Sequence, residues 1–77
     1  MSTRVEWERV FKRGGVYQSG GWFIFDTKSV EVDWWDYEDP PKGHQRWVVY
    51  VGGEYIASGK NLKWAKLMAD HYEQEGY

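Results

Sequence analysis

Cysteine is absent from this chain of 77 residues. Disulfides, a thiol nucleophile and a thiolate metal site are therefore excluded, and the composition fits a reducing compartment. Long apolar runs are missing as well, since no stretch approaches the ~18 apolar residues that a membrane span needs. The first residues also lack an apolar signal core. We therefore expect a cytoplasmic protein that neither crosses nor binds a membrane.

A strong excess of one charge is also missing. Ten basic and twelve acidic residues give a net charge of −2. The charges are unevenly spread, and residues 26–39 hold six acidic groups against one lysine. An electrostatic footprint for nucleic acid is strongly basic. This chain instead has an acidic middle between mildly basic ends, which disfavours nucleic acid as the first choice of partner.

Catalytic groups are scarce, with His44 and His71 as the two histidines. Asp70 precedes His71, but neighbours on a helix point about 100° apart and cannot orient each other. The glycines do not have the spacing of a phosphate-binding loop. A metal site drawn from residues 36–44 matches no known ligand pattern. We therefore predict no catalytic residue, no metal site and no cofactor.

The hydrophobic pattern predicts one α+β domain over residues 1–77. We expect an antiparallel sheet of four to five short strands, with one C-terminal helix packed on one face. Strand-like runs cover 5–11, 22–25, 29–34, 45–51 and 54–57, and residues 16–19 could extend a hairpin. A Gly52-Gly53 turn would place Tyr50 opposite Tyr55 and Val49 opposite Ile56.

The helix is predicted from Leu62 to about Glu75, with Asn61 as its N-cap and Gly76 as its terminator. At about 100° per residue, its core face consists of Leu62, Ala65, Met68, Ala69 and Tyr72. The opposite side carries Trp64, Leu67 and His71, flanked by Lys63 and Lys66. We predict this second set as a partner-binding stripe; alternatives are a homodimer, a rotated helix or cover from the N-terminal segment.

Aromatic residues are abundant, with six Trp, six Tyr and three Phe. Large rings bury ~150–250 Å² each and can supply core volume to a short chain. Periodicity points four of them inward: Trp7, Trp34, Trp47 and Tyr72. Five others do not fit that core face: Trp35, Tyr37, Tyr50, Tyr55 and Trp64.

The rings that do not fit the core face suggest two further candidate binding surfaces. The acidic and aromatic segment would bind a basic partner through Trp35, Asp36, Tyr37, Glu38 and Asp39, because aromatics dominate interface hot spots and acids steer cations. The structural alternative is that its acids merely keep a packed face soluble. The uncovered sheet face could instead stack on nucleic-acid bases, through Phe23, Phe25, Tyr50 and Tyr55 with Arg46 as a cation.

The last third of the chain, Trp47–Gly59 followed by Leu62, Ala65-Lys66 and Ala69-Asp70, resembles the hairpin-plus-helix ending of small uncharacterised actinobacteriophage proteins. The resemblance implies a phage protein that binds a host protein of the replication, transcription or defence machinery. The segment is also faintly similar to the end of the double-stranded-RNA-binding domain. That family's lysine cluster is reduced here to Lys60, Lys63 and Lys66, so no RNA-contacting residue is carried over. We therefore expect a non-enzymatic binding protein that modulates or inhibits a host protein, with a nucleic-acid-binding module as the alternative.

Overall fold

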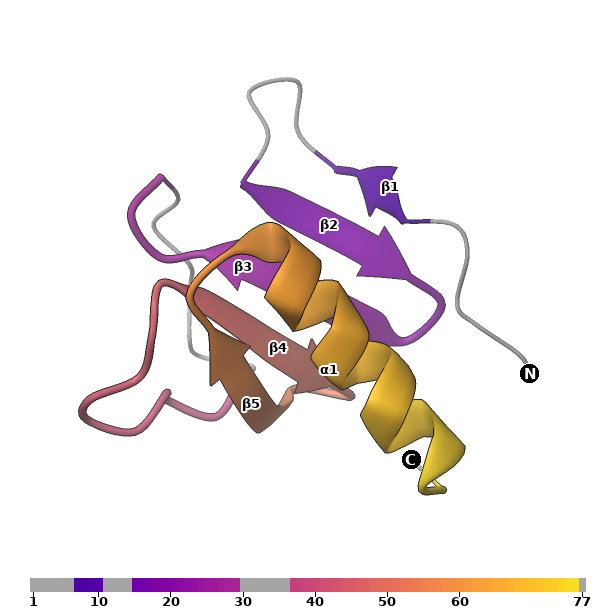
Figure 1. The fold of residues 1–77 in the computed structure, drawn as a ribbon. Coiled ribbons are helices and arrows are strands. Elements are labelled where there is room, and N and C mark those ends of the chain that lie inside the picture. The colour runs from indigo at the N-terminus through magenta and orange to yellow at the C-terminus, as the bar shows by residue number, and fades with distance from the viewer. Residues whose placement is uncertain (1–6, 11–14, 30–36, 77) are drawn as a thin grey trace.

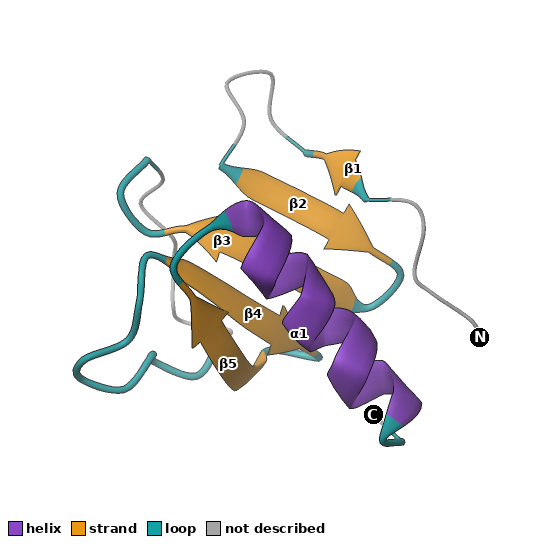
Figure 2. Ribbon diagram, in the orientation of Figure 1, coloured by secondary structure: helices purple, strands orange, loops and turns teal. Residues whose placement is uncertain are grey.

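The computed structural model describes residues 7–10, 15–29 and 37–76, which form a five-stranded antiparallel sheet and one helix (Figure 1). Strand order follows chain order, so each strand pairs with the one before it. The helix α1 (Leu62–Gln74) lies across one face, against β3, β4 and β5 (Figure 2). The predicted fold class is therefore confirmed. The strands are β1 (Glu8–Arg9), β2 (Val16–Ser19), β3 (Trp22–Asp26), β4 (Trp47–Val51) and β5 (Glu54–Gly59).

The hairpin between β4 and β5 turns through Gly52 and Gly53, whose φ angles are +60° and +83°. Both angles belong to a primed turn, which glycine adopts without steric cost. Tyr50 pairs with Tyr55 as predicted. The predicted pairing of Val49 with Ile56 is wrong, because a register shift beside Tyr50 places Ala57 opposite Val49. A β-bulge of this kind adds one residue to one strand.

The face under α1 holds one apolar cluster, called here the helix-side cluster. Its buried members are Trp22, Ile24, Val49, Ala65 and Ala69. Partly buried residues pack around them, including Trp7, Trp47 and Tyr72. These three rings were predicted to point inward and do so, whereas Trp34 lies outside the described residues.

The opposite face of the sheet holds a second apolar group, called here the far-side cluster. Val16, Phe25, Val48 and Tyr50 are buried there, and Phe23, Tyr37 and Tyr55 pack against them. The sequence correctly indicated a second apolar face, but Phe25 and Tyr50 are 5% and 0% exposed. The expectation that this face is uncovered is therefore wrong for these two side chains.

The helix begins where the sequence predicts, because Asn61 Oδ1 accepts a hydrogen bond from the Trp64 amide at 2.8 Å. Such a cap satisfies one of the free amides of the first turn. The last helical residue is Gln74, one position before the predicted end. Ala65 and Ala69 are both fully buried, which confirms the predicted core face.

The remaining strand boundaries differ slightly from expectation. β3 runs one residue further, to Asp26, while β4 starts at Trp47 and β5 continues to Gly59. Of the first predicted strand, the described part shows Glu8–Arg9 as β1. The predicted strand over 29–34 falls almost wholly outside the described residues. In the part of the chain that is described, no helix has the length and apolar character needed to cross a membrane.

Residues 37–46 lie beside the outer edge of β5 (Figure 1). The Glu38 amide donates to the Gly53 carbonyl at 2.7 Å, and the Tyr55 amide donates to Glu38 Oε1 at 3.1 Å. Further along, the Gln45 amide donates to Ser58 Oγ at 3.0 Å. An open strand edge invites pairing with another chain. This segment therefore covers part of the edge that a partner strand would need, at Gly53, Tyr55 and Ser58.

Candidate binding surface

Large apolar side chains are exposed at three places in the described ranges: Val10 at 44%, Trp64 at 46% and Leu67 at 50%. Trp64 and Leu67 lie three residues apart on α1, and exposed His71 lies four residues further on. Residues at this spacing share one face of a helix. We call Trp64, Leu67 and His71 the α1 stripe, and its predicted position opposite the core face is confirmed.

The stripe faces outward because the other side of α1 is anchored in the core. Small Ala65 and Ala69 bring the helix close to the sheet, as close packing requires small residues at a crossing point. The Trp64 side chain also packs closely against Gly59 at the end of β5. A Cβ added at Gly59 would lie 2.5 Å from Trp64 Cδ1, so the indole ring rests directly against this glycine. One side of the exposed ring is therefore packed against the end of β5.

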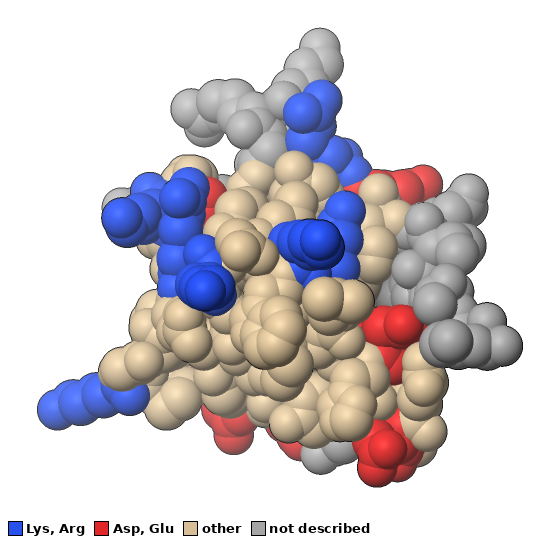
Figure 3. All heavy atoms as spheres, in the orientation of Figure 1, with Lys and Arg blue, Asp and Glu red and all other residues tan. Residues whose placement is uncertain are grey.

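Charge is unevenly distributed around the stripe. The first turn of α1 has no acidic residue, and Lys60 and Lys63 are exposed beside it. Lys66 instead leans toward the sheet, with Nζ 5.5 Å from the centre of the Tyr17 ring. In Figure 3, Lys and Arg side chains gather over the upper part of the face that carries α1, and acidic ones gather toward its lower right. The N-terminal half of the stripe is therefore basic.

Two of the four rings predicted for the nucleic-acid platform, Phe25 and Tyr50, are buried by packing. Tyr50 makes edge-to-face contacts with Phe25, Tyr37 and Tyr55, at ring distances of 5.7, 5.6 and 5.8 Å. Phe23 stacks on Phe25 at 5.9 Å. Such pairs add to the stability gained from area burial alone. The five rings belong to the interior and rim of the far-side cluster, with Phe23, Tyr37 and Tyr55 partly exposed.

Tyr50 also contacts the described part of the acidic segment, at Glu38. Its hydroxyl donates to the Glu38 carbonyl at 2.6 Å. Burial raises the pKa of the Tyr50 phenol well above its usual value, with smaller contributions from Asp39 and Glu38. The phenol therefore stays protonated as a donor at any pH near neutrality.

The acidic segment, predicted to bind a partner, is thus partly occupied within the fold. Glu38 contacts β5 and Tyr50 as described, and Tyr37 packs in the far-side cluster. Asp39 is exposed. Trp35 and Asp36 lie outside the described residues. The structure therefore gives Tyr37 and Glu38 a role in packing that the sequence pattern did not distinguish from partner binding.

Arg46, the cation proposed for the sheet face, forms an ion pair with Asp26. Its Nε donates to Oδ1 at 2.7 Å and its Nη2 donates to Oδ2 at 2.8 Å. Asp26 is 3% exposed and also accepts from the Ser29 hydroxyl and the Lys28 amide. The Arg46 hydrogen bonds, assisted by these two donors, hold the pKa of Asp26 well below its usual range although burial opposes them. Arg46 therefore joins the end of β3 to the start of β4.

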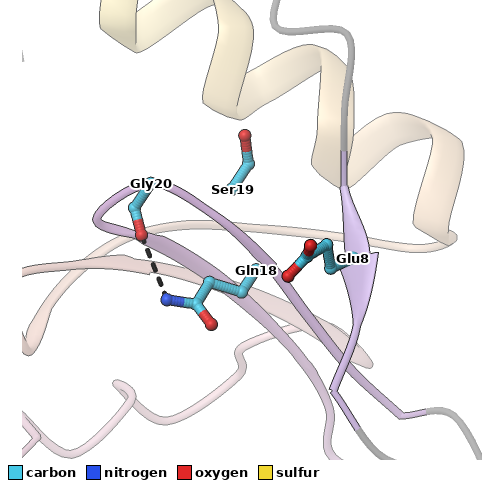
Figure 4. Close-up of a pocket in the computed structure, with 4 residues that line it drawn as sticks. All are labelled: Glu8, Gln18, Ser19 and Gly20. Atoms are coloured by element: carbon cyan, nitrogen blue, oxygen red, sulfur yellow. Dashed lines mark hydrogen bonds between the residues drawn. The ribbon is translucent and has the colours of Figure 1, made fainter.

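One hollow on the described surface has polar lining residues that do not converge on a common point. This hollow of about 380 Å³ is lined by Glu8, Gln18, Ser19 and Gly20. Figure 4 shows the Gln18 amide turned to the Gly20 carbonyl, to which it donates at 3.2 Å, while the Ser19 hydroxyl points the other way. A catalytic site needs a nucleophile and a base within hydrogen-bond reach. These side chains do not converge in that way.

Metal ligation has no candidate among residues 7–10, 15–29 and 37–76, where no group of three His, Asp or Glu side chains could hold an ion. The two histidines also contact different parts of the structure. His44 Nδ1 lies 2.8 Å from the Gln45 carbonyl, and His71 lies on the α1 stripe with its ring 5.3 Å from that of Tyr72. Among the described residues, the α1 stripe holds two of the three exposed large apolar side chains, Trp64 and Leu67.

Sequence reasoning missed two features of the described surface. Gly59 was not recognised as the residue against which Trp64 packs, although glycine permits such a close approach because it has no Cβ. Val10 falls within the first predicted strand, and its 44% exposure was not predicted. Comparison with protein-family models, with curated proteins and with solved structures finds no match to this chain.

Proposed function

We propose that this chain is a non-enzymatic binding protein that attaches to another protein through the α1 stripe. The observation that carries the proposal is the pair Trp64 and Leu67, large apolar side chains that are about half exposed on one helix face. The resemblance to actinobacteriophage proteins adds the expectation that the partner is a host protein. Its replication, transcription or defence machinery would then be modulated or inhibited.

The support for this surface comes partly from how the other candidates are used. Phe25 and Tyr50 are buried, and the edge of β5 is partly covered by Glu38 and Gln45. Trp64 has the properties of an interface anchor, because hot spots are enriched in tryptophan. Its contact with Gly59 also limits the positions open to the ring before binding, which reduces the entropy lost when a partner docks.

The charge around the stripe indicates the chemistry of the partner surface. Lys60 and Lys63 are exposed at the N-terminal end of α1, and the amides of a helix N-terminus add partial positive charge. A partner with an apolar centre and an acidic rim would match this end. Complementary charge of this kind mainly raises the association rate and excludes wrong partners.

Affinity capture from a host-cell lysate tests the proposal with matched variants. Leu67→Lys puts a charge at the centre of the stripe and keeps a good helix former. Val10→Lys makes a comparable change at an exposed side chain that lies outside α1. We expect a captured protein to be retained by the wild type and by Val10→Lys and to be lost with Leu67→Lys.

Two outcomes would contradict this proposal. Equal capture by the wild type and Leu67→Lys would remove the α1 stripe as the binding surface. Loss of capture with Trp35→Ala, together with normal capture by Leu67→Lys, would transfer the function to the acidic segment. Thermal unfolding of each variant separates a lost contact from a lost fold.

A further inference from the structure

We infer that a second copy of this chain occupies the α1 stripe, with the two helices antiparallel about a two-fold axis at Leu67. The inference rests on the proposed function, because it treats the stripe as a protein-binding surface and names one occupant. It adds that the free chain covers its own stripe, so another partner has to displace the second copy.

Helix geometry gives the stripe a two-sided pattern around Leu67. At about 100° per residue, Lys63 and Asp70 flank Leu67 on one side. Trp64 and His71 flank it on the other side. The flanking residues lie three or four positions before and after Leu67. When a second, antiparallel copy is related by a two-fold axis at Leu67, each side of one helix therefore meets the same side of the other helix, with the order of its two residues reversed. This self-matching is the requirement for an isologous contact.

The resulting contacts are complementary in chemistry. Leu67 meets Leu67 of the second copy at the centre of the contact. Exposed Lys63 then faces Asp70 of the second copy, and Trp64 faces His71 of the second copy. Each of these contacts occurs twice because of the two-fold axis. An apolar centre is therefore bordered by two opposite-charge pairs and two pairs of rings.

The charge along α1 selects the antiparallel orientation. Its N-terminal end is basic and its C-terminal end is acidic, and Figure 3 shows the same separation on the face that carries the helix. The basic residues are Lys60, Lys63 and Lys66, and the acidic ones are Asp70, Glu73 and Glu75. A parallel pair would bring like charges together, and its helix dipoles would also repel. An antiparallel pair instead places opposite charges together and aligns the two helix dipoles favourably.

The size of the contact predicts a weak dimer. A helix of 13 residues is ~20 Å long, and a single helix pair falls below the ~1,600 Å² of a standard interface. We therefore expect dissociation in the micromolar range or weaker. Such a dimer can cover the stripe in the free chain and still yield to a tighter partner.

Analytical ultracentrifugation of the full chain over micromolar to millimolar concentrations tests the inference. We expect the wild type to shift from monomer to dimer, and Leu67→Lys to remain a monomer. Lys63→Glu and Asp70→Lys should each weaken self-association by about tenfold, because each replaces two opposite-charge pairs with two like-charge pairs. Val10→Lys serves as the control and should behave like the wild type.

Mixing the two charge variants gives the sharpest result. In the mixed dimer, Glu at position 63 of one copy faces Lys at position 70 of the other, and the native Lys63 and Asp70 face each other. We therefore expect the mixture to associate about as strongly as the wild type, although each variant alone associates weakly.

A wild type that stays monomeric throughout would overturn the inference, and so would dimerisation that Leu67→Lys leaves intact. Should Asp70→Lys lose its fold in thermal unfolding, the Leu67→Lys and Lys63→Glu measurements decide the question. These outcomes are distinct from failure of the proposed function, which is judged by capture of a different protein.

Discussion

Replacement of Tyr50 tests how far the aromatic residues are used by the core. Tyr50 is fully buried in the far-side cluster, and its ring contacts Phe25, Tyr37 and Tyr55. Its hydroxyl donates to the Glu38 carbonyl at 2.6 Å. Tyr50→Phe removes this hydrogen bond and keeps the ring, whereas Tyr50→Ala removes both.

The expected costs follow from these contacts. Loss of one hydrogen bond lowers the free energy of unfolding by about 1 kcal/mol, which corresponds to ~4–8 °C in Tm for a domain of this size. Truncation of a buried ring to alanine costs ~3–5 kcal/mol. A domain of 77 residues has a total stability of ~4–12 kcal/mol. We therefore expect Tyr50→Phe to fold and Tyr50→Ala to be severely destabilised.

Urea and thermal denaturation followed by near-UV circular dichroism measure both changes. Leu67→Ala is the matched control, since Leu67 is half exposed and its truncation should cost only about 1 kcal/mol. If Tyr50→Ala is no less stable than Leu67→Ala, Tyr50 is not part of a packed cluster and the account of the far-side cluster is refuted.

Three further predictions concern single contacts. Gly59→Ala should destabilise the fold by ~1–3 kcal/mol through its clash with Trp64, and most of this cost should be absent in a Trp64→Ala background when both are compared in a double-mutant cycle. Asn61→Ala should cost ~0.5–2 kcal/mol in urea denaturation through loss of the helix cap; no change would contradict the capping role. Because the folded-state pKa of Asp26 is lowered, its contribution to stability should be complete above its ordinary pKa of 3.8 and should be lost as pH falls below it. Tm measured against pH should therefore fall less steeply for Asp26→Asn than for the wild type, and parallel curves would argue against this pair.

Much of the fold was predictable because local signals agreed with each other. The glycine pair at 52–53 predicted its hairpin, and the spacing of Ala65 and Ala69 predicted the buried face of α1. The pairing of Val49 could not be predicted, since a β-bulge depends on packing across the sheet and has no local signature here.

The sequence predicted on which face of the sheet the aromatic rings lie, but not which of them are buried. Periodicity separates the two faces of a strand, and Tyr50 and Tyr55 do lie on the face opposite the helix. Periodicity does not show what covers a face, because the covering residue Tyr37 comes from a loop far away in sequence. The roles of Arg46 and Glu38 were missed for the same reason, since their partners Asp26, Tyr50 and Tyr55 are 12 to 20 positions distant.

The central claim is that the α1 stripe is the interaction surface and that the other clustered rings stabilise the fold. A map of amide chemical-shift changes in isotopically labelled protein, recorded as the captured partner is added, tests this claim most directly. We predict the largest changes at Trp64, Leu67 and His71, with little change at Phe25 and Tyr50. Large changes along Tyr37 to Asp39 with an unaffected α1 would contradict the claim.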